Sequence, residues 1–147
     1  MLKKEGVSGV VSLGGNIVLC GDSPNGKWTV GVRDPEDESK LICEVKLDGN
    51  RSVVTSGAYE RYFEYNGKKY HHIIDPSTGK PAETDILSVT VIGENGTECD
   101  ALSTALFVFG YEKAVDFSKK TNSFGFIIIK NDRSVYVSDN IKDSISL

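Results

Sequence analysis

Cysteine is scarce in this sequence, and its distribution argues against two common kinds of small protein. The cysteines are Cys20, Cys43 and Cys99, an odd number at widely separated positions. No two of them form the C-x-x-C pair typical of zinc sites, and an odd set does not suit a disulfide framework. We therefore predict buried free thiols, because an unpaired cysteine packs as a small apolar side chain.

Long apolar runs and a surplus of basic residues are also missing. No stretch approaches the roughly 20 apolar residues that span a bilayer, and no hydrophobic segment follows Lys3 and Lys4 as it would in a signal peptide. The formal net charge is −4, whereas a general nucleic-acid binder needs lysine and arginine gathered on one face. The sequence thus indicates neither a membrane span nor a nucleic-acid partner, and it leaves the compartment open.

The remaining composition is that of a soluble globular protein. The 147 residues are 39% hydrophobic and 26% charged, enough for one ordinary core. We therefore expect a single domain over residues 1–147. Apolar, alternating or β-branched runs bounded by turn residues predict strands over 7–13, 17–20, 29–33, 41–47, 52–56, 70–74, 86–92, 124–129 and 135–138.

Two helices are predicted towards the C-terminus. Asp100 is a good N-cap for a helix over 101–109, in which apolar residues recur at helical spacing. A second amphipathic helix is predicted over 111–120, after a break at Gly110. Many strands interrupted by a late helical pair indicate an α+β fold with a mainly antiparallel sheet.

Three further segments carry weaker signals. Residues 2–5 resemble the last turn of a helix that stops at Gly6, which suggests that preceding sequence is missing. Residues 93–99 are interpreted as a loop. The tail after Asp139 is expected to fray.

Both histidines of the chain lie together before an Asp-Pro turn. Asn66-Gly67 between two aromatic runs is a strong hairpin signal, and it directs the return strand towards His71, His72 and Asp75. A neutral imidazole can move a proton or hydrogen-bond a phosphate, and Asp75 could orient it. The alternative is that one histidine faces inward as a structural residue while the other is simply exposed.

Asp100 and Thr104 stand one helical turn apart and so share a face. Mg²⁺ prefers oxygen ligands and often takes one or two from the protein, with the rest from water and substrate phosphates. The pair could therefore hold such a cation. The alternative is that Asp100 only caps the helix and Thr104 only bonds the preceding turn.

Gly14, Gly15 and Asn16 lie between two predicted strands. Paired glycines permit a tight turn, and they also permit a ligand to lie against bare backbone amides. The residues alone leave both interpretations open.

Three blocks together resemble the ApbE family of magnesium-dependent FAD:protein FMN transferases. They are SLGGN (12–16), TSGAYERYFEYNGKKYHHIIDPSTGKPA (55–82) and DALSTALFVFG (100–110), in the family's order. The resemblance implies a T-fold-like α+β half, with FAD as substrate, Mg²⁺ as cofactor and a threonine of a target protein as acceptor. It covers the C-terminal half of such proteins, so the N-terminal half is expected to be absent.

The same resemblance implies roles for individual residues. The flavin nucleotide would be bound by Gly14, Gly15, Asn16, Tyr59, His72 and Asp75, and the metal by Asp100 and Thr104. His72, the second histidine of the pair, and Asp100 are the candidate catalytic bases.

Several alternatives remain at this stage. The chain could be a non-catalytic flavin-nucleotide-binding module, or an FAD pyrophosphatase that uses water as the nucleophile. It could also be a small sheet domain that completes itself as a homo-oligomer. Relatives are often exported, membrane-anchored lipoproteins, but nothing in this sequence assigns a compartment.

Overall fold

Six antiparallel strands form the central layer of the computed structural model, which describes residues 5–146. All neighbouring pairs in this sheet run antiparallel. The predicted α+β fold with a mainly antiparallel sheet is therefore confirmed. In sheet order the strands are β1 (Gly9–Leu13), β2 (Asn16–Cys20), β5 (Ser52–Gly57), β10 (Ile86–Gly93), β11 (Gly125–Lys130) and β12 (Val135–Val137).

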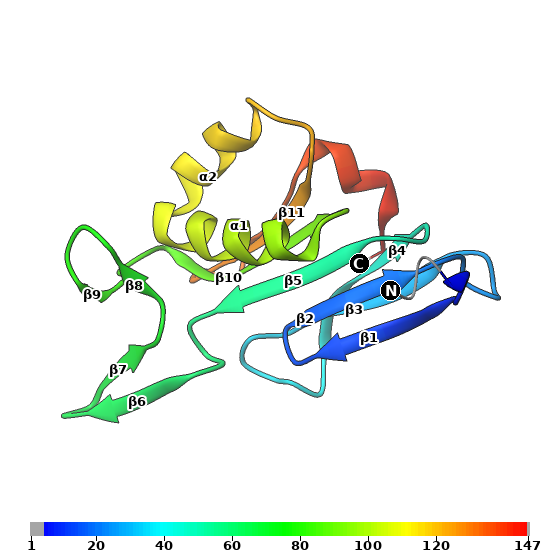
Figure 1. The fold of residues 1–147 in the computed structure, drawn as a ribbon. Coiled ribbons are helices and arrows are strands. Elements are labelled where there is room, and N and C mark those ends of the chain that lie inside the picture. Colours follow the sequence, from blue (N-terminus) through cyan, green and yellow to red (C-terminus); the bar gives the residue numbers. More distant parts are fainter. Residues whose placement is uncertain (1–4, 147) are drawn as a thin grey trace.

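The helical pair covers one face of the central sheet (Figure 1). α1 (Gly96–Phe109) packs on β5 and β10, and α2 (Tyr111–Ser118) follows it after Gly110. A smaller sheet of β3 (Trp28–Arg33), β4 (Leu41–Leu47) and β13 (Ile145–Ser146) packs on the other face. A 3-10 helix, η2 (Asp139–Ser144), leads into β13.

Two short antiparallel pairs stand apart from these layers. β6 (Tyr62–Tyr65) pairs with β7 (Lys68–His71), and β8 (Ile74–Asp75) pairs with β9 (Lys80–Pro81). The strand predicted over 70–74 is thus divided between β7 and β8.

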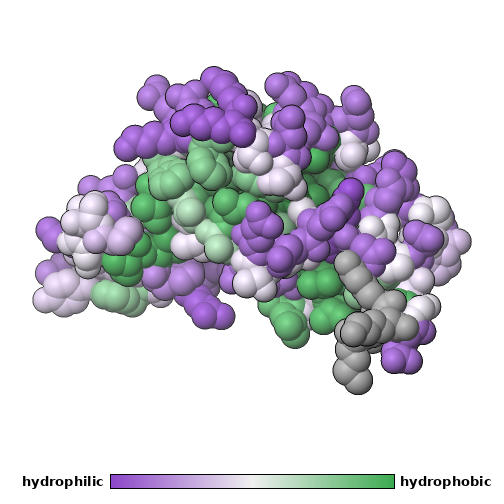
Figure 2. Space-filling view, turned by 45° about the horizontal axis from the view of Figure 1, so that its top comes forward, coloured by the Kyte–Doolittle hydropathy of each residue, from purple (hydrophilic) through white to green (hydrophobic). Residues whose placement is uncertain are grey.

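Side chains along each strand of the central sheet point alternately to its two faces, so the core consists of two clusters, one on each face. In β10, Val89 and Val91 point into the cluster under the helices, whereas Ile92 points into the cluster under β3 and β4. This is the two-residue period of a sheet covered on both faces. Figure 2 shows hydrophilic residues over the helices, and some hydrophobic surface beneath them and beside the grey residues.

The start of α1 differs from the prediction. The helix begins at Gly96, and its N-cap is Asn95, whose side chain accepts hydrogen bonds from the backbone N–H groups of Thr97 (3.1 Å) and Glu98 (3.4 Å). The prediction that Asp100 caps the helix and that 93–99 is a loop was therefore wrong. Asparagine at the N-cap satisfies the free amides and outweighs the low helix propensity of the following glycine.

The C-terminal tail also differs from the prediction, because it is ordered by packing. Ile145 pairs with Val45 of β4, and Ile141 and Ile145 pack against the cluster between the two sheets. A Cβ atom at Gly125 would lie 2.3 Å from Ile141, so this glycine makes room for the tail. At the other end, Leu2–Lys4 of the predicted helix end lie outside the described residues.

The prediction of buried free thiols is confirmed for Cys20, Cys43 and Cys99. Burial raises the pKa of the Cys99 thiol to about 11 and also raises that of Cys43. No helix between residues 5 and 146 has both the length and the apolar character needed to cross a membrane.

An ion pair joins the loop after β3 to the turn between β11 and β12. Arg133 donates from Nη1 to Oδ1 of Asp34 (2.8 Å) and from Nη2 to Oδ2 (2.5 Å). These bonds hold the pKa of the Asp34 carboxyl well below its usual range. A carboxyl whose pKa is lower in the folded state stabilises the fold above its ordinary pKa of 3.8, and this stabilisation is lost as the pH falls through the folded value.

We therefore expect Asp34→Asn to lower the melting temperature at neutral pH. Below about pH 4 the melting temperature of the variant should fall less steeply with pH than that of the wild type. Differential scanning fluorimetry across this pH range measures both effects. Asp48→Asn, which alters an exposed carboxylate in the β4–β5 loop, serves as the control and should follow the wild-type curve. Identical curves for Asp34→Asn and the wild type would contradict the prediction.

Candidate functional site

Gly57 ends β5 and allows the chain to fold back at Tyr59. A Cβ atom at Gly57 would lie 2.4 Å from Cε1 of the Tyr59 ring, so a side chain there would collide with the ring. Burial, followed by the negative charge of Glu60, raises the pKa of the Tyr59 phenol to about 12. Tyr59 is therefore a neutral group at physiological pH and can donate a hydrogen bond.

The turn between β1 and β2 reaches the same place. Gly14 has a φ of 70°, which glycine adopts without steric cost. A Cβ atom at Gly15 would lie 2.9 Å from the Thr55 carbonyl oxygen and 3.1 Å from Oε1 of Glu60. The Thr55 N–H donates to the Gly15 carbonyl oxygen (2.8 Å). The paired glycines thus bring bare backbone against β5 and Glu60.

These two segments border a cavity of about 440 Å³ between β3 and the central sheet. The structure therefore brings together three of the predicted nucleotide-binding residues, Gly14, Gly15 and Tyr59. The volume is within the range of small-molecule sites. The walls are formed by Ser12, Gly14, Gly15, Ile17, Val30, Gly31, Val32, Arg33, Val53, Thr55, Tyr59, Glu60 and Thr90.

Asn16 is separated from the two glycines by the alternation of the strand. Ile17, the next residue of β2, lines the cavity, so Asn16 belongs to the other face. There it lines a hollow with Asn95 and Thr97 at the start of α1. The structure therefore places Asn16 on the helix side of the sheet.

His72 is exposed, and the Arg61 carbonyl orients it. The backbone N–H of His72 (3.2 Å) and its ring Nδ1 (3.1 Å) both lie within hydrogen-bond distance of this oxygen. A carbonyl can only accept, so Nδ1 carries the hydrogen and Nε2 of the neutral ring keeps its lone pair. The hydrogen bond thus leaves Nε2 available as a base.

Glu60 links His72 electrostatically to the cavity. Burial raises the pKa of the Glu60 carboxyl, and the positive charge of His72 is the largest of several that oppose this rise, followed by Arg61 and Arg33. Glu60 also lies over Gly15. The imidazole is therefore close enough to the cavity wall for its charge, when it is protonated, to act on the Glu60 carboxyl.

His71 is the structural member of the pair. Its Nε2 lies 3.1 Å from the Ala82 carbonyl oxygen, and its ring packs edge-on against Phe107 with the centroids 5.6 Å apart. The Nδ1 atom is buried and has no partner within residues 5–146. These contacts join the base of the β6–β7 hairpin to Ala82, which follows β9, and to α1.

Asp75 organises a turn. Its Oδ1 accepts hydrogen bonds from the backbone N–H and the hydroxyl of Ser77, both at 2.8 Å, and these bonds lower the pKa of the Asp75 carboxyl. The Gly79 N–H closes the turn on the Asp75 carbonyl oxygen (2.9 Å). The hydrogen-bond partner of His72 is thus Arg61, and the suggested orienting contact from Asp75 is replaced by this carbonyl.

Asp100 and Thr104 are both exposed on α1, and hydroxyl groups connect them to β5. The hydroxyls of Ser103 (3.0 Å) and Thr104 (3.3 Å) donate to the Asp100 carbonyl oxygen. The Ser56 hydroxyl lies 2.8 Å from that of Ser103 and 3.2 Å from that of Thr104. Thr104 therefore makes the bond to the preceding turn that the alternative interpretation predicted.

The side chains around Asp100 and Thr104 are of the chemical type that a hard cation prefers. A carboxylate and several hydroxyls offer only oxygen, which is what Mg²⁺ requires. Residues 5–146 contain no cluster of three or more His, Cys, Asp and Glu side chains that could hold a metal. Asp100 and Thr104 could thus supply part of a coordination shell, and water or substrate phosphates would have to complete it.

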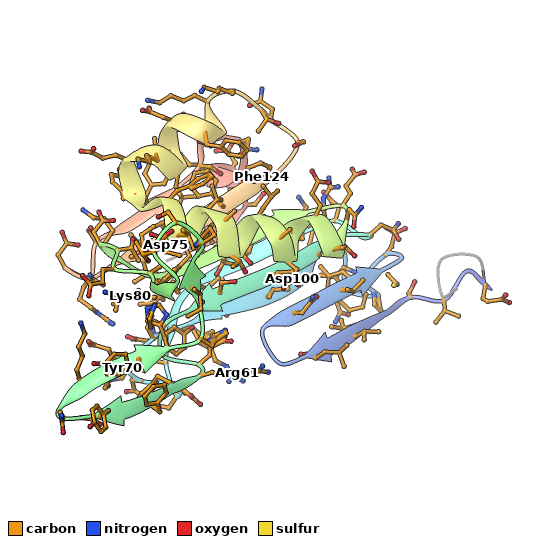
Figure 3. The ribbon with its side chains drawn as sticks, turned by 60° about the vertical axis from the view of Figure 1, so that its left-hand side comes forward. Arg61, Tyr70, Asp75, Lys80, Asp100 and Phe124 are labelled. Carbon is orange, nitrogen blue, oxygen red and sulfur yellow. The ribbon has the colours of Figure 1, made fainter. Side chains whose placement is uncertain are left out.

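The structure does not join these oxygens to His72 in the cavity at Gly15 or in the groove beside the hairpin. Asp100 and Thr104 line neither the cavity at Gly15 nor the groove that contains His72. Figure 3 shows Asp100 on α1, above Arg61 and Tyr70 of the hairpin. The predicted convergence of positions 72, 100 and 104 therefore remains a prediction.

Sequence reasoning missed three contributors to this region. Glu60 lies in the cavity wall, and the hydroxyls of Thr55 and Thr90 meet there at 2.9 Å. The sequence could have indicated Glu60, because it directly follows Tyr59. It could not have indicated the Thr55–Thr90 contact, because the pairing of β5 with β10 cannot be predicted from local sequence.

Comparison with known proteins identifies the family. The sequence model of the ApbE family matches residues 1–128. An FAD:protein FMN transferase of Treponema pallidum is 42% identical over 147 aligned positions, which cover 94% of this chain and 41% of that protein. An FAD:protein FMN transferase of Escherichia coli K12 is 35% identical, with 91% of this chain and 39% of that protein covered. The chain thus spans about two-fifths of the length of these relatives.

Solved structures give the same result. The crystal structure of the ApbE protein from Thermotoga maritima superposes with a TM-score of 0.85 at 38% identity, covering 95% of this chain and 45% of that one. The flavin transferase ApbE from Vibrio cholerae superposes with a TM-score of 0.76 at 29% identity, covering 97% of this chain and 46% of that one. Because the family model matches most of the sequence and the fold agrees, this chain belongs to the ApbE family.

Proposed function

We propose that this chain forms part of a magnesium-dependent FAD:protein FMN transferase. The observation that carries the proposal is the cavity at Gly15 and Tyr59, whose wall residue Glu60 lies within electrostatic reach of the His72 imidazole. Relatives named FAD:protein FMN transferase support it. Because the chain spans about two-fifths of their length, we expect its own activity to be weak.

The residues of the chain suggest how FAD would be held. Bare amides at Gly14 and Gly15 can approach a diphosphate closely, and the neutral Tyr59 phenol can donate to a phosphate or ribose oxygen. Asn16 and Asp75 remain proposed nucleotide contacts on the family resemblance. Such positioning is the main contribution that a protein makes to phosphoryl transfer.

The reaction is a substitution at the phosphorus that carries FMN. A threonine hydroxyl of the acceptor forms the new P–O bond, the bond to AMP breaks, and AMP leaves. His72 Nε2 takes the hydroxyl proton, with Asp100 as the alternative base. Asp100 and Thr104 would hold Mg²⁺, which when bound would neutralise negative charge on the diphosphate.

Binding of FAD tests the proposal without requiring turnover. Gly15→Val would push side-chain atoms against the Thr55 carbonyl and Glu60, and we expect FAD affinity to fall about tenfold or more. Flavin fluorescence titration with and without Mg²⁺ measures this. Gly9→Val is the matched control, because a Cβ atom at Gly9 meets nothing within 4 Å, and its affinity should equal that of the wild type.

Analysis of the products distinguishes the alternatives. AMP release together with a flavinylated acceptor supports the transferase, and AMP with free FMN indicates an FAD pyrophosphatase. Binding of FAD without AMP release indicates a non-catalytic module. If FAD neither binds nor yields AMP, the proposed function is wrong for this chain.

A further inference from the structure

The β6–β7 hairpin projects from the molecule with little support. Within residues 5–146 the two strands pair only with each other, and Asn66 (φ 51°) and Gly67 (φ 73°) form the two-residue turn. Figure 1 shows the hairpin extending away from the helices and the central sheet. A lone two-stranded hairpin is marginal in water, so this one is well placed to gain stability from a partner.

Large aromatic side chains are exposed along the hairpin. Phe63 and Tyr65 are each 64% exposed, and Tyr62 is 46% exposed. Phe63 stacks on Tyr70 with the ring centroids 5.2 Å apart. Clustered exposed aromatic residues are characteristic of interaction surfaces, where rigid rings bury area at a low entropic cost.

One side of the hairpin borders a groove of about 500 Å³ that reaches His72. Its lining includes Phe63 and Tyr70 from the hairpin, Ile74 and Pro81 from β8 and β9, and Arg61 and His72. Most of this surface is apolar, and Ile74 is 47% exposed. A chain lying in the groove would therefore pass beside the candidate base.

The charge of the hairpin differs from that of the whole chain. Arg61, Lys68 and Lys69 outnumber Glu64 between positions 61 and 72, whereas the net charge of the chain is −4. Nζ of Lys69 lies 4.6 Å from the centroid of the Tyr62 ring, and Nζ of Lys68 lies 5.7 Å from that of Tyr70. Lys68 is paired with Glu83 (3.0 Å), so the positive groups on offer are Arg61 in the groove and Lys69 beside Tyr62 at its border. Together with the apolar area they complement a segment with apolar and acidic side chains.

We propose that the groove between the β6–β7 hairpin and β8–β9 docks an extended, acidic segment of the acceptor protein. The inference rests on the proposed function, because it places the acceptor hydroxyl at His72. β6 and β7 each have one edge without a strand partner in the described structure, so an extended segment can also pair with the backbone there. Apolar side chains of the segment occupy the groove, and its acidic side chains face Arg61 in the groove and Lys69 at its border.

A peptide of about 12 residues tests the docking in the absence of FAD and Mg²⁺. It carries leucine and phenylalanine alternating with aspartate and glutamate around one threonine, and a fluorescein label for anisotropy. Phe63→Ser and Lys69→Glu should each weaken its binding about tenfold. Leu13→Ser, at an exposed apolar residue of β1, and Lys46→Glu, at an exposed lysine of β4, are matched controls that should leave the affinity unchanged.

A counterpart peptide with lysine in place of each acid should bind at least about tenfold more weakly than the acidic one. Equal binding of the two peptides, or no effect of Phe63→Ser, overturns the proposal. Loss of FAD binding by Phe63→Ser with peptide binding intact would assign the groove to the flavin instead. A dimer in sedimentation that Phe63→Ser dissociates would assign it to a second copy.

The docking and the proposed function fail separately. Peptide binding by a chain that does not bind FAD would support the docking surface and contradict the proposed function. FAD binding by a chain that does not bind the peptide would support the proposed function and contradict the docking surface.

Discussion

Replacing His72 by asparagine is expected to slow AMP release from FAD by about 10²- to 10⁴-fold, the usual contribution of a positioned acid or base. The imidazole Nε2 has its lone pair free because Nδ1 bonds the Arg61 carbonyl, and an asparagine amide cannot accept a proton in its place. The affinity for FAD should fall by a much smaller factor than the rate, since Gly14, Gly15 and Tyr59 form the cavity wall and His72 would be only one of several nucleotide contacts. Single-turnover assays of AMP at saturating FAD and Mg²⁺ measure the rate.

The neighbouring histidine provides the matched comparison. His71→Asn should lower the melting temperature, because His71 contacts Ala82 and Phe107 inside the structure. It should change the rate of AMP release much less than His72→Asn does. A rate for His72→Asn within about threefold of the wild type would remove His72 from the reaction. Asp100 would then be the remaining candidate base.

Phe107→Ala is expected to destabilise the fold by about 3–5 kcal/mol, because truncating a buried phenylalanine loses burial and leaves a cavity. Phe107 is completely buried in the core under α1. For a domain of this size the loss lowers the melting temperature by roughly 10 °C. Urea denaturation followed by circular dichroism gives the change in the free energy of unfolding.

Phe109→Ala is the control for this effect. The residue lies two positions further along the same helix and is 43% exposed, so the expected change is about 1 kcal/mol or less. Equal destabilisation by the two variants would contradict the burial argument, because replacing phenylalanine by alanine raises the helix propensity at both positions and so cannot cause the loss. The Phe107 variant should also loosen the hairpin, because the Phe107 ring packs against His71.

Much of the strand layout was predictable because the signals are local. Alternation and β-branched runs mark β3, β4 and β10, and Asn66-Gly67 marks the hairpin between β6 and β7. The order of the strands was not predictable, since β5 pairs with β2 and β10 through contacts between distant parts of the chain. The tail from Asp139 was misjudged for the same reason, because its order depends on packing in the second core.

The candidate site was only partly predictable. The family blocks suggested Gly14, Gly15 and Tyr59 as nucleotide contacts, and the structure places all three in the wall of one cavity. Local sequence does not tell which strand face a residue takes, so Asn16 was grouped with its glycine neighbours although it lies across the sheet. Asp100 was assigned as the helix cap because the stronger signal at Asn95 was interpreted as part of a loop.

The ion pair of Asp34 and Arg133 connects residues 99 positions apart. A contact between groups so far apart in sequence carries a larger loop-closure entropy than a local one, so we expect it to form late in folding. An interaction absent from the transition state slows unfolding without speeding folding. We therefore expect the guanidinium–carboxylate contact to act mainly by prolonging the lifetime of the folded molecule.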